Sequence, residues 1–335
     1  MHQKGTLDRN PLGDGDNAHR DMRHREPRMR LTEALLYQLV KCFYRSEVAH
    51  SAEMKEALNS VEKYDAYRAT QIQRVTTAAD AYGVQIKGQQ LLDLGCAEGT
   101  LTAEFIRHGA RHVIGVDIDA KFIECARKTF AHLPAEFVVS QPTGLPVPDA
   151  SIDTIISFDV FEHVTRPGNL LRECLRVLKP GGQMLIGTWG WHNPFAPHLW
   201  ATMPVPWAHV FFSERTILRT CRRVFLSDWY APNQFDLDEH GQKKRDKYTY
   251  VGISTDYVNK YLLSDFEQTF HEVGFKSRMN VLPFSSSYAS WTKPLLRIPL
   301  LREYLHSYFW AVLTKPEVSV RAEASQPVRE EAVCV

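Results

Sequence analysis

The stretch from residue 91 to residue 188 alternates short apolar runs with helical segments, and this alternation constrains the fold more than any other feature of the sequence. Each apolar run has the length of a buried strand rather than that of a buried helix. Strands that are apolar throughout and separated by helices are typical of a parallel sheet covered on both faces. The sequence therefore predicts strands at 91–94, 113–116, 137–139, 152–157 and 184–188, with helices at 102–107, 121–130 and 170–178.

A glycine-rich turn follows the first predicted strand, in the sequence LLDLGCAEGT. Gly95 and Gly99, with Ala97 between them, let a ligand approach the backbone where larger side chains would intrude. The spacing differs from the G-x-G-x-x-G turn that holds a pyrophosphate. Asp93 and Glu98 add negative charge beside the turn, which suits a ligand with a cationic amino group and a sulfonium better than a dinucleotide.

An acidic residue, Asp117, ends the second predicted strand some twenty residues after the turn. A carboxylate in this place accepts hydrogen bonds from both hydroxyls of a ribose. The third strand leads into Ser140 and Gln141, and residues 179–182 supply a turn before the fifth strand. Together these features predict a nucleoside site at the carboxyl ends of the strands.

In these stretches the chain resembles the class I S-adenosylmethionine-dependent methyltransferases, in the small-molecule branch that includes quinone-biosynthesis enzymes. The matching sequences are LLDLGCAEGTLT, VIGVDIDAKFIECAR, LPVPDASIDTIISFDVFEHV and LRVLKPGGQMLI. The resemblance implies an α/β fold, Rossmann-like and doubly wound, with a mostly parallel seven-stranded sheet. It also implies S-adenosyl-L-methionine as the co-substrate.

The resemblance further assigns the residues that bind this cofactor. The glycine turn would pass under its methionyl part, Asp117 would bind its ribose, and Ile118 would pack on its adenine. Gln141 stands where the family often has an acid, and its side-chain oxygen is a weaker acceptor for the adenine amino group. The predicted cofactor-binding residues are Asp93, Gly95, Ala97, Gly99, Asp117, Ile118, Gln141 and Phe158.

The sequence DVFEH, residues 159–163, follows the fourth predicted strand at the edge where open α/β sheets place their active sites. His163 is a candidate general base, because imidazole titrates near neutral pH, and the alternative is that it only braces the loop. Asp159 and His192 complete the predicted catalytic set, and His198 is a further candidate base. Asp159, Glu162, His163 and His192 also resemble a metal cluster of some quinone and small-RNA methyltransferases. Because the Glu-His pair is common in members without a metal, we predict none.

The rest of the sequence divides into five segments. Residues 1–30 carry few large apolar side chains and are predicted to be disordered, whereas residues 31–90 show the spacing of N-terminal helices. Towards the end of the sequence, the pattern again predicts regular structure, with a helix at 264–273 and strands at 277–282 and 308–314. We therefore predict a methyltransferase core at 91–188 and 263–316, a cap at 189–262 and a flexible tail at 317–335.

The predicted cap holds five of the seven tryptophans of the chain. We interpret it as a mainly helical lid whose aromatic side chains hold an apolar acceptor near the reacting methyl group. Packing against a partner subunit in a homodimer, and peripheral contact with a membrane, are the alternatives. Prolines in the segment break any long amphipathic helix, which weakens the membrane interpretation.

Composition narrows the function. The formal net charge of +1 lacks the basic excess of a nucleic-acid-binding protein, so no nucleic acid partner is expected. Scattered cysteines without a CxxC pair, no signal peptide and no transmembrane segment lead us to expect a cytoplasmic protein. We expect O-, N- or C-methylation of a small, largely apolar metabolite. The alternatives are an RNA or protein methyltransferase and a non-catalytic S-adenosylmethionine-binding assembly protein.

Overall fold

The structure of the chain is a computed structural model. It describes residues 29–44, 56–142, 144–238, 240–244, 248, 258–285 and 287–317. Apart from their boundary positions, the predicted disordered segment 1–30 and the predicted flexible tail 317–335 lie outside the described residues.

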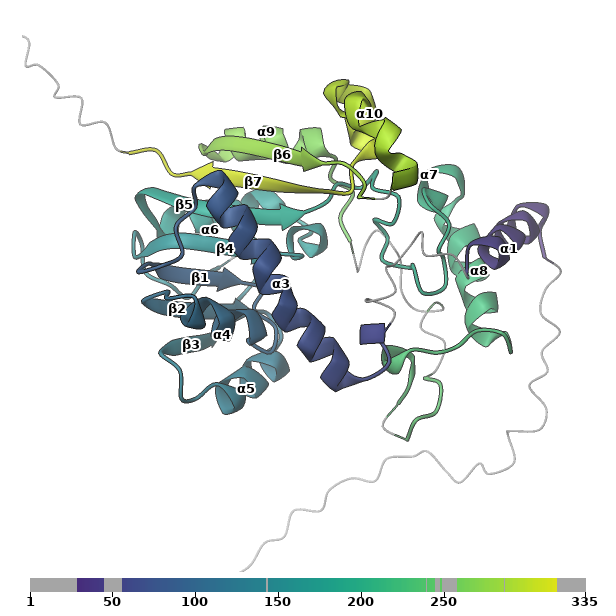
Figure 1. The fold of residues 1–335 in the computed structure, drawn as a ribbon, viewed down its shortest axis with the longest axis horizontal. Coiled ribbons are helices and arrows are strands. Elements are labelled where there is room, and N and C mark those ends of the chain that lie inside the picture. Colours follow the sequence, from purple (N-terminus) through teal and green to yellow (C-terminus); the bar gives the residue numbers. More distant parts are fainter. Residues whose placement is uncertain are drawn as a thin grey trace, which may run out of the picture.

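A seven-stranded sheet forms the centre of the described chain, in the order β3-β2-β1-β4-β5-β7-β6 (Figure 1). The strands are β1 (Gln90–Leu94), β2 (His112–Asp117), β3 (Ala135–Val139), β4 (Ile152–Phe158), β5 (Leu178–Thr188), β6 (Lys276–Leu282) and β7 (Tyr308–Thr314). The first five pair in parallel, whereas β7 pairs antiparallel with both β5 and β6. The seven predicted strands are confirmed, and they form one Rossmann-like sheet. The sheet is mixed, because β7 runs antiparallel to β5 and β6; an antiparallel neighbour such as β6 followed by β7 needs no crossover helix.

Helices cover both faces of this sheet, because successive strand residues point to opposite sides. On one face α3 (Val61–Tyr82) and α4 (Thr100–Arg107) pack over a cluster that includes Leu91. On the other face α6 (Pro167–Val177) and α9 (Leu263–Val273) pack over a cluster that includes Leu92. The helix α5 (Ala120–Thr129) packs against β2 and β3. The predicted helices and strands of the core are all present with shifted ends, and the predicted turn at 179–182 forms the irregular start of β5.

A separate hydrophobic cluster, the cap, lies beyond the carboxyl ends of the parallel strands, on the right in Figure 1. It is built by α1 (Leu31–Phe43) and the described part of the segment 189–262, and the connection between β6 and β7 contacts this segment through the hydrogen bond from Trp207 Nε1 to the Tyr304 carbonyl. The segment 189–262 contains α7 (Ala208–Phe211), α8 (Glu214–Leu226) and η3 (Gln234–Asp236), and the connection contains η5 (Ser287–Arg297) and α10 (Pro299–Leu305). The described part of 189–262 is less helical than predicted, because four prolines precede α7 and interrupt helix formation.

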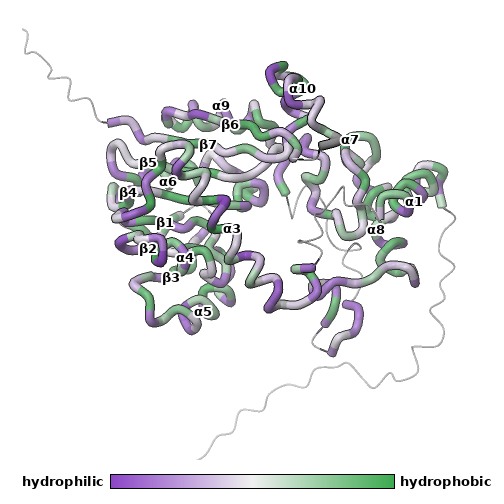
Figure 2. The backbone as a smooth tube through the Cα atoms, in the orientation of Figure 1, coloured by the Kyte–Doolittle hydropathy of each residue, from purple (hydrophilic) through white to green (hydrophobic). Residues whose placement is uncertain are grey.

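The helix α1 joins the cap instead of the sheet. It packs on α8, with Leu36 and Val40 fully buried, and Glu33 accepts a 2.5 Å ion-paired hydrogen bond from Arg223 Nε. Figure 2 shows α1 as mostly hydrophobic, whereas α3 carries hydrophilic stretches along its length. Among the described helices, none is long and apolar enough to cross a membrane. The predicted group of N-terminal helices therefore splits between two parts of the molecule.

Candidate active site

The glycine turn lies between β1 and α4, and its backbone adopts left-handed conformations. Gly95 has φ +81° and Gly99 has φ +84°, and Ala97 between them has φ +47°. A Cβ atom on Gly95 would collide with the side chain of Val160, and one on Gly99 would lie 2.6 Å from the ring of Phe137. Both glycines are therefore required by the packing of the protein itself, in addition to the room that they leave for a ligand.

Asp117, at the end of β2, ties the strand to the glycine turn. Its Oδ2 accepts a hydrogen bond from the Ala97 backbone N–H at 3.0 Å, and its Oδ1 accepts one from the Asp119 N–H at 2.9 Å. A carboxylate offers about four acceptor positions, so two stay available for ligand hydroxyls. The carboxylate thus combines a structural role with the predicted ribose-binding role.

Partly or largely exposed apolar side chains lie around Asp117. Ile118 is 66% exposed, Phe122 is 39% exposed, and Val139, which pairs with Asp117 between β2 and β3, is 37% exposed. Gln141, which follows β3, is exposed as well. A flat base that packs on Ile118 and reaches the Gln141 amide would cover this surface, so these residues fit the predicted nucleoside.

Asp93 lies in β1 beneath the turn and is almost fully buried. Its Oδ2 accepts a hydrogen bond from the Thr102 hydroxyl at 2.5 Å. Burial raises the pKa of Asp93 to about 6, although the Thr102 bond and the positive charge of Arg68 on α3 oppose the shift. Glu98, the other acid of the turn, is exposed. The negative charge predicted beside the turn is therefore present, but Asp93 carries it fully only above about pH 6.

Asp159 directly follows β4 and has a left-handed backbone with φ +55°. Its backbone N–H donates to the Gly187 carbonyl at 3.0 Å, and its Oδ1 accepts from the Tyr308 hydroxyl at 2.7 Å. Burial raises the pKa of Asp159, against the effect of the Tyr308 bond. A strained conformation held by two hydrogen bonds is typical of a functional position.

Glu162 lies in the short helix η2 (Phe161–His163) and is 3% exposed. Its Oε2 accepts from the Thr188 hydroxyl at 2.5 Å, while Oε1 accepts no hydrogen bond from a described residue. His198 Nε2 lies 4.0 Å from Oε1. Burial, followed by the charge of Asp159, raises the pKa of Glu162 to about 8. The carboxyl is therefore mostly protonated below about pH 8.

His163 and His198 meet beside Glu162. Their ring centroids are 4.9 Å apart, and the ring of Trp189 lies 4.9 Å from that of His198. One ligand atom from each of Glu162, His163 and His198 lies within 4.8 Å of the others, so these three residues have the spacing to hold a metal ion. This set differs from the alternative drawn from the sequence, because it takes His198 in place of His192 and does not include Asp159.

His192 lies elsewhere in the cap. Its ring stacks on that of Tyr304 in α10, with centroids 4.2 Å apart, and burial lowers its pKa. The structure thus brings Asp159, Glu162, His163 and His198 together but places His192 against α10.

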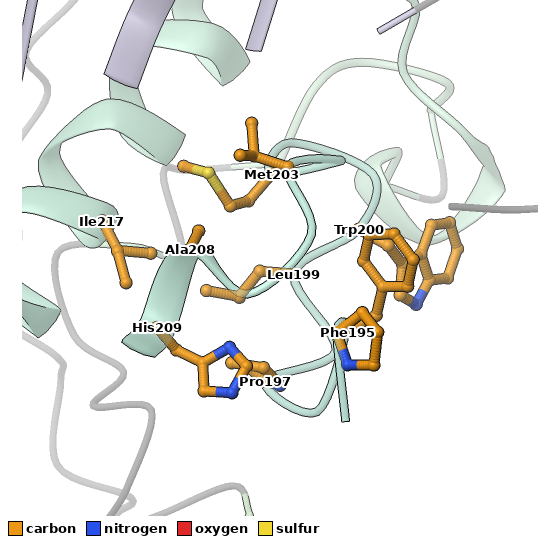
Figure 3. Close-up of a pocket in the computed structure, with 10 residues that line it drawn as sticks. Phe195, Pro197, Leu199, Trp200, Met203, Ala208, His209 and Ile217 are labelled. Carbon is orange, nitrogen blue, oxygen red and sulfur yellow. The ribbon is translucent and has the colours of Figure 1, made fainter. Parts of the chain in front are cut away.

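An apolar pocket lies in the cap, between the chain at 194–205 and the helices α7 and α8 (Figure 3). Its interior volume is only about 10 Å³, room for roughly one water molecule, and it opens into a depression of about 240 Å³ that includes solvent. Pro197 and Leu199, the two neighbours of His198 in sequence, contribute to its wall. The lining residues are Pro194, Phe195, Pro197, Leu199, Trp200, Met203, Val205, Ala208, His209 and Ile217. The pocket therefore adjoins the histidine cluster, and some of the predicted aromatic residues of the cap line it. Trp229 instead packs on Tyr37 and Tyr44 inside the cap.

Two residues of the site carried no signal that sequence reasoning used. Tyr308 is 149 positions away from Asp159, and nothing near it in sequence marks it as a hydrogen-bond donor to that carboxylate. Arg74 on α3 lies over the rings of Phe158 and Tyr308, at 5.4 and 5.2 Å from their centroids. In the sequence, the only indication was that Arg74 lies between the apolar residues Ile72 and Val75, which are buried in the structure. A charged residue in this place indicates that the helix face reaches a polar site.

The chain is similar to known methyltransferases. The methyltransferase domain family matches residues 92–186. A Mycobacterium bovis (BCG Pasteur) protein described as an uncharacterized methyltransferase is 30% identical over 228 residues, which span 68% of this chain and 77% of that protein. A protein of Mycobacterium tuberculosis H37Rv with the same description matches to the same extent. A solved structure of an S-adenosylmethionine-dependent methyltransferase from Mesorhizobium loti is 17% identical, with a TM-score of 0.44 over 71% of this chain and 96% of that one.

Proposed function

The chain belongs to the S-adenosylmethionine-dependent methyltransferases, and from this we propose that it methylates a small, largely apolar metabolite at oxygen, nitrogen or carbon. The quinone-biosynthesis enzymes of the family have acceptors of this kind, and we place the chain near them. The acceptor would enter between the cap and the carboxyl ends of the strands.

The cofactor would bind along the turn and β2. Asp117 would accept hydrogen bonds from the ribose, Ile118 and Gln141 would contact the adenine, and the turn from Gly95 to Gly99 would carry the methionyl part. When bound, S-adenosylmethionine supplies a methyl group on a sulfonium, which an acceptor atom takes by in-line displacement. Asp93 favours the positive charge of this ligand above about pH 6, where its carboxyl is ionised.

One observation supports this kind of acceptor: the apolar pocket of the cap lies next to the cluster of Glu162, His163 and His198, where some buried polar atoms have no hydrogen bond to a described residue. Glu162 Oε1 and Trp189 Nε1 are buried and form no hydrogen bond with any described residue. Buried polar atoms normally have partners, so such atoms at the bottom of a site favour a ligand with a polar group there. The pocket beside them offers mainly apolar walls. An acceptor with one polar reacting end and an apolar body fits both features.

The cluster also offers a path for the proton of the acceptor. His163 is exposed, and its ring lies against that of His198, so it is placed to take a proton from an acceptor O–H or N–H and release it to water. Glu162, neutral below about pH 8, would hold its bond to Thr188 and keep negative charge away from the reacting centre. Exclusion of water by the cap and alignment of the acceptor would supply much of the acceleration.

A labelling experiment tests this proposal. The protein is incubated with S-adenosylmethionine labelled in the methyl group and a metabolite extract, and the label is then separated into solvent-extractable and acid-precipitable fractions. We expect label in the solvent-extractable fraction, and much less of it with the Asp117→Ala variant at a cofactor concentration below saturation. Label in acid-precipitable RNA or protein would instead support a macromolecular substrate. Cofactor binding in calorimetry without transfer to any fraction would support a non-catalytic role.

A further inference from the structure

The connection between β6 and β7 carries an unusual surface. In η5 and α10 the exposed large apolar residues are Trp291 at 66%, Ile298 at 47% and Leu300 at 69% exposure. Lys293 and Arg297 are exposed between them, and residues 287–302 contain no Asp or Glu. Figure 2 shows hydrophobic and hydrophilic stretches side by side along α10.

The inner side of this connection is firmly attached to the rest of the protein. Glu303 accepts hydrogen bonds from the backbone N–H groups of Leu263 and Ser264 at 2.8 and 3.0 Å, which satisfies the start of α9. Arg302 forms a 2.8 Å ion pair with Glu267, and Trp207 Nε1 donates to the Tyr304 carbonyl at 3.1 Å. The outward apolar residues are therefore held in place by a well-packed base, and their exposure is a feature of the folded state.

We propose that the surface formed by Trp291, Lys293, Arg297, Ile298 and Leu300 docks the protein on a lipid bilayer that contains anionic lipids. Tryptophan and leucine partition into the boundary between headgroups and acyl chains, and basic side chains next to them bind anionic headgroups. Pro294 lies inside η5 and Pro299 begins α10, so the segment consists of two short helical pieces, which suit a shallow interfacial contact and not a span.

The charges favour a bilayer over a second copy of the chain. Lys293 and Arg297 form no ion pair with any residue in the described ranges, so both cations stay available to an external anion. Two such surfaces facing each other would bring like charges together at an apolar contact, which is unfavourable. A sheet of anionic headgroups above an apolar layer matches both the cations and the large apolar side chains.

The surface lies close to the active site. Tyr304 at the end of α10 stacks on His192 of the cap, and Tyr308, four residues later, donates to Asp159. A helix of this length spans about 10 Å. If the proposed function holds, an acceptor with an apolar body would reach the pocket directly from the bilayer; this consequence rests on that function, whereas the docking itself does not.

Vesicle sedimentation with the full chain tests the docking. One set of vesicles is pure phosphatidylcholine, and in the other about a third of the lipid is phosphatidylglycerol. We expect clear binding to the anionic vesicles that weakens in high salt, because salt screens the attraction of headgroups for cations. Lys293→Gln with Arg297→Gln should weaken this binding roughly 30-fold, and Trp291→Ser with Leu300→Ser roughly tenfold or more.

The matched control is Leu35→Ser, which removes an exposed apolar residue of α1, in the cap. This variant should bind vesicles like the unchanged protein. Equal loss with Leu35→Ser would show unspecific hydrophobic adsorption and would overturn the proposal. So would absence of binding to anionic vesicles, or a change of oligomeric state by light scattering in the Trp291 and Leu300 variant. Cofactor affinity is measured on the same samples, so that a failure of docking and a failure of methyl transfer are seen separately.

Discussion

Replacement of Asp117 by alanine separates the structural role of this carboxylate from its ligand-binding role. In the structure the carboxylate accepts two backbone hydrogen bonds, from Ala97 and Asp119, and it has acceptor capacity left for two ribose hydroxyls. Hydrogen bonds to a charged group contribute about 1.5–3 kcal/mol when the partner is removed. We therefore expect Asp117→Ala to weaken S-adenosylmethionine binding by about 1.5–3 kcal/mol, or roughly 10- to 150-fold in Kd.

The assay is isothermal titration calorimetry with S-adenosylmethionine, together with urea unfolding followed by circular dichroism. The variant also loses its bond to Ala97, so its free energy of unfolding should fall by about 1–3 kcal/mol. Asp119→Ala is the matched control, because Asp119 caps α5 through a 2.8 Å bond from the Lys121 N–H. It should cost about 1 kcal/mol of stability and leave the affinity unchanged.

The comparison of the two variants decides the matter. If Asp117→Ala is folded and binds the cofactor within twofold of the unchanged protein, the carboxylate serves only to fix the turn. If Asp119→Ala loses as much affinity as Asp117→Ala, the loss comes from a distorted turn, and the assignment of the ribose to Asp117 is wrong.

Other predictions concern pH, the pocket and metal. Because the pKa of Asp93 is raised to about 6, cofactor affinity should increase from pH 5 to pH 7, and Asp93→Asn should remove this dependence in calorimetry. The pKa of Glu162 is raised from 4.5 to about 8, so the folded protein keeps a proton that the unfolded chain releases. The free energy of unfolding should therefore fall as pH rises through this window, by up to about 1.4 kcal/mol per pH unit, and urea titrations should show a flatter profile for Glu162→Gln. Trp200→Ala should raise the KM for the acceptor about tenfold, because it removes one aromatic contact in the pocket wall, and should spare cofactor affinity. Trp229→Ala should instead lower stability without a selective change in KM. Activity should survive EDTA, since a neutral Glu162 is a poor metal ligand; loss of activity that added magnesium, manganese or zinc restores would contradict this.

The sequence predicted the core well because its signals are local. The apolar runs mark the strands directly, and the turn from Gly95 to Gly99 needs its residue types for backbone conformation and for packing against Val160 and Phe137. Asp117 could be placed because it ends a strand that the pattern defines. The sequence did not predict that these glycines are also needed for packing inside the protein. Gly95 and Val160 are far apart in sequence, and their contact forms only when the chain folds.

The cap and the proton-handling residues were harder to predict because their contacts are not local. Glu33 of α1 pairs with Arg223 of α8, 190 positions away, and no periodic pattern reveals such a pair. The helical spacing of α1 gave its secondary structure but not its place, since an apolar stripe fits any apolar partner. The sequence reasoning preferred His192 to His198 for the catalytic set, whereas in the structure the ring of His198, a residue with φ +56°, lies beside that of His163.

The position of β7 has a consequence for how the protein is made. It is the last strand in sequence, yet it lies inside the sheet, and it is the only sheet neighbour of the edge strand β6 among the described residues. On the ribosome, β6 must therefore wait for β7, which is translated about 1 to 5 s later at ordinary rates. The strand β7 also carries Tyr308, which donates a hydrogen bond to Asp159. A nascent chain that stops before residue 308 lacks both the pairing of β6 and this hydrogen bond, so the same strand completes the edge of the sheet and the contact with Asp159.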